Sequence, residues 1–220
     1  MQRIDVNYLL DLELPFFEPP NQRRGGWSGV SMVECAGQRF FVKKQKNHTY
    51  REPRRFYRPT PTLRREYRNI LRFRKLGLVT PSVVLYGERG DDGVLVTTAL
   101  EDYVDLVSWL SSTQDETARL DFFNELTSQL LRIHEARFHH GCLYGAHIMV
   151  KPDSPREIAY LDLESLRRTL RPAHNASKDI GQLFRHTEAI NEKERAIIVD
   201  AYESRYPGFK TRLATRLTKT

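Results

Sequence analysis

The chain has 220 residues, enough to bury a hydrophobic core in one domain or in two small lobes. Its 35 lysine and arginine residues exceed its 28 acidic residues, and the net charge of +7 predicts an acidic partner: nucleotide phosphates, nucleic acid or an anionic membrane face. The two cysteines, Cys35 and Cys142, lie far apart in the sequence, which argues against a disulfide scaffold or a zinc site. We expect a cytosolic protein, because the N-terminus lacks a leader pattern and no segment is apolar enough to cross a bilayer.

The first 100 residues contain strand patterns and one helix pattern. Residues 25 to 43 alternate apolar with small or polar residues around "AGQ", which predicts a β-hairpin with a glycine-containing turn. Residues 43 to 65 carry nine basic residues, one acid and three prolines, which predicts an exposed loop. A helix is predicted from residue 65 and ends at Gly77 in the manner of a C-cap. Two short strands follow, "SVVLYGE" and "GVLVTTAL", separated by the turn signal "RGDDG".

The rest of the chain is mainly helical by pattern. An amphipathic helix is predicted from about Glu116 to Arg137. Its apolar residues at helical spacing are Phe122, Phe123, Leu126, Leu130 and Ile133. The stretch "HHGCLYGAHIMV" follows directly, and "EIAYLDLES" predicts a short buried strand that reaches an acidic pair. We expect an α+β architecture, with a β-rich N-terminal lobe at residues 1–100 and a mainly helical C-terminal lobe at residues 101–220.

Several features fall in the chain order that a phosphotransferase of the protein-kinase type requires. In "RRGGWSG", Gly25, Gly26 and Gly29 would let a hairpin backbone approach phosphates, although hairpins also collect glycine without a ligand. Lys43 ends the apolar strand "FFVK", where a lysine pairs with nucleotide phosphates or simply ends a strand in solvent. Glu66 lies early in the following helix, either as the ion-pair partner of that lysine or as a helix N-terminal charge.

The next feature is a catalytic-loop pattern. The stretch "HGCLYGAHIMV" reproduces the frame His-x-Asp-Leu-x-x-x-Asn from His140, with Cys142 at the Asp place and His147 at the Asn place. Asp162 then ends an apolar strand, where a metal-holding carboxylate is expected. Each residue alone has a structural explanation, as a strand-end cap or a packed histidine. Because the features share one order, we interpret them together as a kinase-type site.

The sequences of five segments resemble the lipopolysaccharide kinase family of Gram-negative bacteria, of the Kdo kinase and WaaP type, and within it the InaA branch. These segments are "PNQRRGGWSGV", "FFVKKQ", "REYRNI", "LYGAHIMV" and "YLDLES". The resemblance covers the chain from about Pro20 to Tyr206. It implies a protein-kinase-like bilobal fold, and ATP-dependent phosphorylation of sugars of the lipopolysaccharide core with Mg²⁺. The implied partner is the core oligosaccharide or its lipid-linked precursor.

The resemblance also implies roles for residues that contact the nucleotide. Lys43 is similar to the phosphate-binding lysine of the family, and Glu66 to its partner. The segment with Thr98, Leu100 and Glu101 is similar to the hinge that faces adenine. These roles are carried over from the family and do not follow from spacing alone.

The resemblance extends to the metal-site and loop residues, but Cys142 departs from the family pattern. Asp162 resembles the metal ligand, and a histidine at the place of His147 also occurs in the family. Asp179 corresponds to an acid that braces the catalytic loop, or is a plain charge at a helix start. Cys142 departs from the catalytic Asp, because a thiol with a pKa of about 8.5 is mostly protonated at pH 7. Three interpretations stay open: an active enzyme in which His140 or a loose transition state compensates, a nucleotide-binding pseudokinase or scaffold for a related active kinase, and a thiolate activated by a lysine or a metal.

The basic stretch at residues 43 to 65 also leaves alternatives open, because Tyr50, Phe56 and Tyr57 lie among its arginines. It is a solvated loop, a nucleic-acid surface, or a contact to an acidic glycolipid that keeps the chain peripheral at the inner face of the inner membrane. Nucleic acid is the less economical partner. Kinases of aminoglycosides or choline share the fold, but their cationic acceptors suit an acidic cleft and this chain is basic. A protein acceptor is disfavoured, since only 58 residues follow Asp162.

Overall fold

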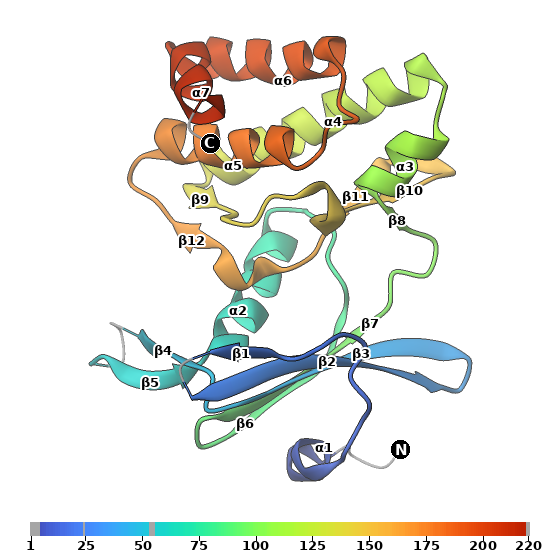
Figure 1. The fold of residues 1–220 in the computed structure, drawn as a ribbon, viewed down its shortest axis with the longest axis vertical. Helices are drawn as coiled ribbons and strands as arrows, with labels where there is room; N and C mark the ends of the chain where they lie inside the picture. The colour runs from blue at the N-terminus through green and yellow to red at the C-terminus, as the bar shows by residue number, and fades with distance from the viewer. Residues whose placement is uncertain (1–4, 24, 53–55, 219–220) are drawn as a thin grey trace. The chain divides into compact units, whose positions relative to one another are not determined.

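The computed structural model describes residues 5–23, 25–52 and 56–218, and the chain divides into two compact units (Figure 1). The first unit comprises Met1–Leu71 and Pro81–Glu101. The second unit comprises Arg72–Thr80 and Asp102–Thr220. Each unit has its own sheet and its own buried apolar residues.

The first unit is built on a five-stranded antiparallel sheet in the order β1-β2-β3-β7-β6. Its strands are β1 Asn21–Arg23, β2 Gly26–Cys35, β3 Gln38–Lys46, β6 Val83–Arg89 and β7 Asp92–Thr98. The predicted hairpin is confirmed as β2 and β3, and its two turn residues, Ala36 and Gly37, have φ of 52° and 75°. Positive φ at both positions is the type I′ geometry, which matches the twist of the strands. The two predicted strands after Gly77 are confirmed as β6 and β7, whereas the short strand β1 is not predicted by its sequence.

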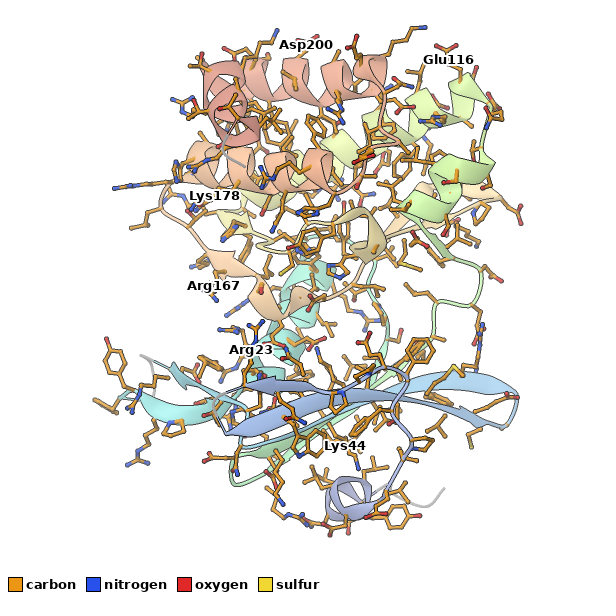
Figure 2. All side chains as sticks on the ribbon, in the orientation of Figure 1. Arg23, Lys44, Glu116, Arg167, Lys178 and Asp200 are labelled. Atoms are coloured by element: carbon orange, nitrogen blue, oxygen red, sulfur yellow. The ribbon has the colours of Figure 1, made fainter. Side chains whose placement is uncertain are left out.

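One face of this sheet carries the apolar core of the first unit. The buried residues at its centre are Val42, Val94 and Val96. Helix α1, Val6–Asp11, packs on this face through Val6, Leu9 and Leu10. Lys44 lies on the same side, where its Nζ donates a hydrogen bond to the carbonyl of Leu12 (Figure 2). Because successive side chains of a strand point to opposite faces, Lys43 is directed to the other face.

The stretch from residue 43 to residue 65 is not the exposed loop that its charge predicts. Strand β3 continues to Lys46, and β4, Thr49–Glu52, pairs antiparallel with β5, Arg58–Pro61, in a two-stranded ribbon. Residues 53–55, which belong to the predicted loop, lie outside the described residues. Helix α2, Thr62–Lys75, then begins three residues before its predicted start.

The early start of α2 has a cause far away in the sequence. The side-chain oxygen of Gln45 on β3 accepts hydrogen bonds from the Leu63 amide at 2.8 Å and from the Thr62 hydroxyl at 2.9 Å. Gln45 therefore satisfies a helix N-terminal donor in the way a local cap residue usually does. At the other end, Gly77 has φ of 72°, which is the left-handed value expected of the predicted C-cap.

The second unit is mainly helical. Its helices are α3 Leu106–Ser112, α4 Glu116–Glu135, α5 Pro172–Arg185, α6 Glu192–Arg205 and α7 Phe209–Leu217. Its strands are β8 Val104–Asp105, β9 Phe138–His139, β10 Ile148–Lys151, β11 Ser154–Tyr160 and β12 Arg167–Arg168, with short 3₁₀ turns at Gly145–His147 and Leu163–Ser165. All five apolar residues predicted for the inner face of α4 are buried, and α4 packs against α5, α6 and β11. No helix in the described ranges is both long and apolar enough to cross a bilayer.

Candidate functional site

Lys43 and Glu66 form the ion pair that the sequence predicts within the first unit. Lys43 Nζ lies 2.6 Å from Glu66 Oε2, and the two side chains are 20% and 11% exposed. Strand β3 directs Lys43 away from the α1 side, and Glu66 lies in the second turn of α2. Partial burial reduces screening by water and salt, so this pair fixes the position of the ammonium group better than a surface pair would.

The three glycines of "RRGGWSG" differ in their surroundings. Gly25 lies in the turn between β1 and β2 with φ of 77°, and a Cβ there would meet nothing within 4 Å. A Cβ on Gly26 would lie 2.4 Å from the carbonyl oxygen of Lys46, and a Cβ on Gly29 would lie 2.4 Å from the ring of Phe16. Close packing within the unit therefore explains Gly26 and Gly29 without a ligand. Gly25 has no such close neighbour, and its positive φ explains the glycine there, while its backbone is exposed.

The segment predicted to face adenine continues from β7. The Thr98 amide donates to the Ser82 carbonyl at 2.9 Å, which fixes the end of the strand. The Glu101 carboxylate accepts a hydrogen bond from Arg39 Nε at 2.8 Å, and this bond lowers the pKa of Glu101. Leu100 lies between these residues in irregular backbone, and the first unit ends at Glu101. Because the Glu101 carboxylate already has a partner, the main chain of this segment is better suited to contact a base.

The loop from residue 139 to residue 147 in the second unit, here called the catalytic-like loop, is held by Asp179 of α5. Asp179 Oδ2 accepts from the His140 amide at 2.7 Å, and Oδ1 accepts from the Gly141 amide at 3.0 Å. Asp179 is buried and lies in the middle of α5, so it is not a charge at a helix start. Of the two roles that the sequence leaves open for Asp179, the structure shows the bracing role.

Two histidines complete the hydrogen bonds of Asp179. His134 of α4 donates Nε2–H to Oδ2 at 3.1 Å, and its Nδ1 accepts from the Tyr202 hydroxyl of α6 at 2.5 Å. His139 donates Nδ1–H to Oδ1 at 3.2 Å. Burial alone would raise the pKa of Asp179, but the hydrogen bonds from the two histidines outweigh it and hold that pKa far below its usual range. Asp179 is therefore ionised and can accept all four bonds.

Gln182, which is not among the residues predicted from the sequence, makes a second contact from α5 to the catalytic-like loop. It lies three residues after Asp179 and therefore on the same face of the helix. Its side-chain oxygen accepts from the Leu143 amide at 3.3 Å, and its nitrogen donates to the Tyr144 hydroxyl at 3.0 Å. The spacing of the acid and the amide in "KDIGQL" is the signal that could have identified it, once this helix face is known to meet the loop.

Cys142 contributes to the loop through its main chain. Its carbonyl accepts a hydrogen bond from His147 Nδ1 at 2.9 Å. Burial raises the pKa of the Cys142 thiol, although a hydrogen bond with Ser165 acts in the opposite direction. The side chain is therefore a neutral thiol at pH 7, which argues against an activated thiolate.

His140 is buried beneath the loop. Its ring lies between Phe73 and Tyr160, with centroid distances of 6.2 Å and 6.5 Å, and its Nδ1 accepts from the Cys142 amide at 3.4 Å. Burial lowers the pKa of His140 to about 4, although the charge of Asp179 acts in the opposite direction. A neutral imidazole with 1% exposure is not placed to take a proton from a substrate hydroxyl.

The buried His140 predicts a loss of stability in mild acid. Its pKa is depressed in the folded chain, so between about pH 6.5 and about pH 4 the unfolded chain binds the proton more readily. The free energy of unfolding should therefore fall by about 3 kcal/mol across this range because of His140 alone. Urea unfolding at a series of pH values measures this change in the free energy of unfolding. His140→Phe should flatten the profile and the exposed His186→Gln should not; an unchanged slope in His140→Phe contradicts the assignment.

Asp162 and His147, the residues predicted to hold a metal, lie close together in the second unit. Asp162 follows β11 in a left-handed conformation, with φ of 49° and ψ of 59°, and its Oδ2 lies 3.9 Å from His147 Nδ1. The Leu161 amide donates to the His147 carbonyl at 2.9 Å, which connects the two segments. Because His147 Nδ1 donates its proton to the Cys142 carbonyl, Nε2 keeps the lone pair that metal binding requires.

The Asp162 carboxylate is the kind of group that could hold a divalent metal bound to phosphate. Mg²⁺ is usually held by one or two carboxylates together with phosphate oxygens and water, so Asp162 would be its protein ligand here. The imidazole of His147 suits Mg²⁺ less well than a softer divalent ion. In the part of the chain that the structure describes, no group of three or more His, Cys, Asp or Glu side chains could hold a metal. Metal binding by these residues would therefore depend on the phosphates.

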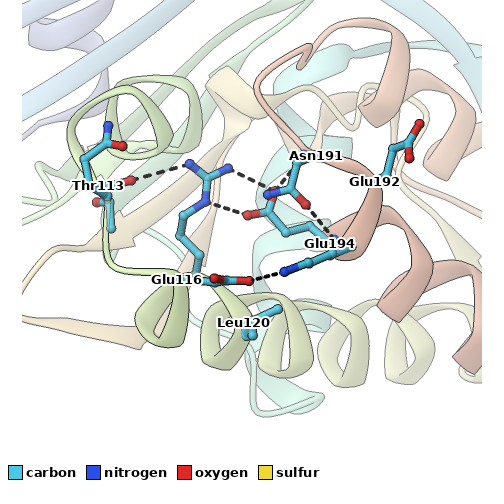
Figure 3. A pocket seen from close by; sticks show the side chains of 9 residues that line it. Thr113, Glu116, Leu120, Asn191, Glu192 and Glu194 are labelled. Atoms are coloured by element: carbon cyan, nitrogen blue, oxygen red, sulfur yellow. Dashed lines mark hydrogen bonds and ion pairs between the residues drawn. The ribbon is translucent and has the colours of Figure 1, made fainter.

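A cavity of about 440 Å³ in the second unit lies between the start of α4 and the start of α6 (Figure 3). Four of its charged groups pair with one another: Arg119 Nε lies 2.5 Å from Glu194 Oε1, and Lys193 Nζ lies 2.7 Å from Glu116 Oε1. Arg119 also donates to the carbonyl of Ala189 at 2.9 Å. None of the site residues predicted from the sequence lines this cavity. Its polar groups are therefore explained by the packing of the two helices.

Comparisons with known proteins identify the family and the fold of the chain. The sequence model of the lipopolysaccharide kinase (Kdo/WaaP) family matches residues 8–202. Protein InaA of Escherichia coli (strain K12) is 30% identical over 195 residues, which cover 84% of this chain and 89% of InaA. The crystal structure of an aminoglycoside-3'-phosphotransferase of type VIII superposes with a TM-score of 0.57 at 14% identity, covering 93% of both chains, and at this identity it shows the fold alone. The chain has the expected protein-kinase-like fold and belongs to the lipopolysaccharide kinase (Kdo/WaaP) family.

Proposed function

We propose that the chain binds ATP with Mg²⁺ and transfers a phosphoryl group to a sugar hydroxyl of the lipopolysaccharide core or of its lipid-linked precursor. The family and the fold support a phosphotransferase. The observation that carries the proposal is the ion pair between Lys43 and Glu66, because kinases need this pair to hold the lysine against nucleotide phosphates. ATP and a lipid-linked acceptor meet at the inner face of the inner membrane, so we expect the chain to work there, on the cytoplasmic side.

Each group has a role that matches its chemistry. Lys43 would contact the phosphates, and the open backbone at Gly25 would lie over them. The main chain from Thr98 to Glu101 would contact adenine. Asp162 and His147 would hold Mg²⁺, which supplies positive charge to the phosphate oxygens when bound.

Proton transfer is the weak point of this mechanism. The neutral thiol of Cys142 and the buried imidazole of His140 are both poor acceptors for the proton of a sugar hydroxyl. Because phosphoryl transfer depends mostly on positioning and charge stabilisation, we expect a slow enzyme rather than an inert one. The cysteine itself favours a second candidate, a nucleotide-binding pseudokinase that assists a related active kinase in core assembly.

Nucleotide binding is tested by thermal unfolding of the whole chain with ATP and Mg²⁺. At roughly 100 times the dissociation constant, a ligand specific to the folded state should raise Tm by about 5–10 °C for a chain of this size. Lys43→Met should remove most of this shift. The control is Lys46→Met, at the exposed end of the same strand, which should keep it. An unchanged Tm at millimolar ATP and Mg²⁺ would overturn both the enzyme and the pseudokinase proposals.

A further inference from the structure

The ribbon of β4 and β5 presents two aromatic side chains at its tip. Phe56 and Tyr57 are 93% and 61% exposed. Both have left-handed backbone conformations, with φ of 53° and 59°. Non-glycine residues rarely adopt this conformation, and two in succession are unfavourable unless the surrounding chain imposes them. The backbone of these two exposed aromatic residues therefore has an unfavourable conformation.

The root of the ribbon is anchored on α2. The Arg65 guanidinium lies over the Tyr50 ring at 4.6 Å, and Arg68 forms an ion pair with the buried Glu52. The Tyr57 amide donates to the Glu52 carbonyl at 3.0 Å, so these contacts continue to the base of the tip. These contacts fix the root of the ribbon on α2, and within the first unit β4 and β5 extend outward beyond the end of the sheet (Figure 1).

The charge around the tip is positive. Glu52 is the only acid between residues 43 and 65, and Arg68 neutralises it. Arg51 on β4 and Arg58 on β5 are exposed on either side of the turn. Solvent-exposed aromatic side chains flanked by arginines match the boundary of an anionic bilayer, where rings enter the headgroup region and cations pair with phosphates.

We propose that four described residues of the β4–β5 ribbon dock on an anionic phospholipid bilayer: Phe56 and Tyr57 insert, and Arg51 and Arg58 lie at the headgroups. This inference deepens the proposed function, on which it rests for the lipid-linked acceptor that brings the chain to a membrane. Single-stranded RNA fits less well, because binding it takes a series of free aromatic platforms and the Tyr50 ring is already covered by Arg65. Insertion of two side chains and pairing of two charges gives reversible attachment rather than permanent anchoring.

Vesicle sedimentation of the whole chain tests this docking. Binding to phosphatidylcholine vesicles with about 30% phosphatidylglycerol should exceed binding to pure phosphatidylcholine, and it should weaken between about 0.1 M and about 0.5 M salt. The double variant Phe56→Ser with Tyr57→Ser should lower the partition coefficient at least tenfold, roughly as expected for two lost apolar side chains. The matched control is Leu170→Ser, which removes an 89% exposed leucine of the second unit and should leave binding unchanged.

Depth of insertion is measured separately. A tryptophan at position 56, made by Phe56→Trp, should be quenched by lipids brominated near the headgroup in excess of the wild-type background from Trp27 and Trp109. Equal binding by wild type and the double serine variant, or tighter binding to single-stranded RNA than to anionic vesicles, would overturn the proposal. Lys43→Met should bind vesicles like wild type, so failure of nucleotide binding and failure of membrane docking are told apart.

Discussion

Replacing Cys142 with aspartate is expected to raise the rate of phosphoryl transfer to a core oligosaccharide by roughly 10²- to 10⁴-fold. The catalytic-like loop already has its main chain fixed by Asp179 and Gln182, so a carboxylate at position 142 would start from a positioned backbone. It would accept the proton that a neutral thiol accepts poorly. The measurement is transfer of labelled phosphate from ATP to purified core oligosaccharide in the presence of Mg²⁺.

Two further variants test whether a faster rate in Cys142→Asp comes from the added carboxylate and depends on the metal site. Cys142→Ser keeps the size of the side chain without adding a base, and it should give no increase. Asp162→Ala removes the carboxylate expected to hold the metal, and it should abolish transfer in the wild-type and Cys142→Asp backgrounds alike. If the wild-type chain transfers nothing and Cys142→Asp transfers measurably, the protein is a pseudokinase. If the wild type transfers well and Cys142→Asp adds nothing, proton acceptance does not limit the reaction.

Asp179→Asn is expected to lower the free energy of unfolding by about 3–5 kcal/mol, because it removes the charge from a buried, fully hydrogen-bonded group. The amide nitrogen of asparagine would face at least one of the N–H donors that now meet the carboxylate, and two donors cannot pair. The loop backbone at His140 and Gly141 would lose its support. Chemical unfolding in urea at pH 7 gives the value.

The control for Asp179→Asn is Asp200→Asn on α6. Asp200 pairs with Lys210 at 2.8 Å, but both side chains are well exposed, so its loss should cost less than about 1 kcal/mol. The stability from Asp179 should also depend on pH. Its pKa is depressed in the folded chain, so its contribution is complete above the unfolded value of about 3.9 and is lost as the pH falls below it. Equal losses in the two variants at pH 7 would contradict the bracing role.

Much of the first unit could be predicted from the sequence, because its signals are local. The "AGQ" turn and the alternating residues on each side specify the β2–β3 hairpin. Strand period and helix phase place Lys43 and Glu66, and the ion pair follows once β3 and α2 pack together. The pattern from His140 to His147 could also be recognised in the sequence, because all of its residues lie in one short segment with fixed numbers of residues between them.

The features that the sequence did not reveal depend on contacts between distant residues. The side chain of Gln45 on β3 caps the N-terminus of α2, and neither the residue type nor its spacing in the sequence indicates this contact. The high charge of residues 43 to 65 predicts a loop rather than the β4–β5 ribbon, because charge does not indicate that the root of the ribbon packs on α2. The sequence predicts a phosphate-binding role for Gly26 and Gly29, but the Lys46 main chain and the Phe16 ring lie so close to them that no side chain would fit. Local patterns carry no information about such neighbours.

The bracing of the catalytic-like loop by α5 separates its shape from its chemistry. Asp179 and Gln182 contact main-chain amides of the loop, and the side chain at position 142 takes no part in these contacts. We therefore expect the loop to keep its conformation when the thiol at position 142 is replaced by an acid. For the same reason, we expect relatives that differ at position 142 to superpose in this loop, whether or not they turn over substrate.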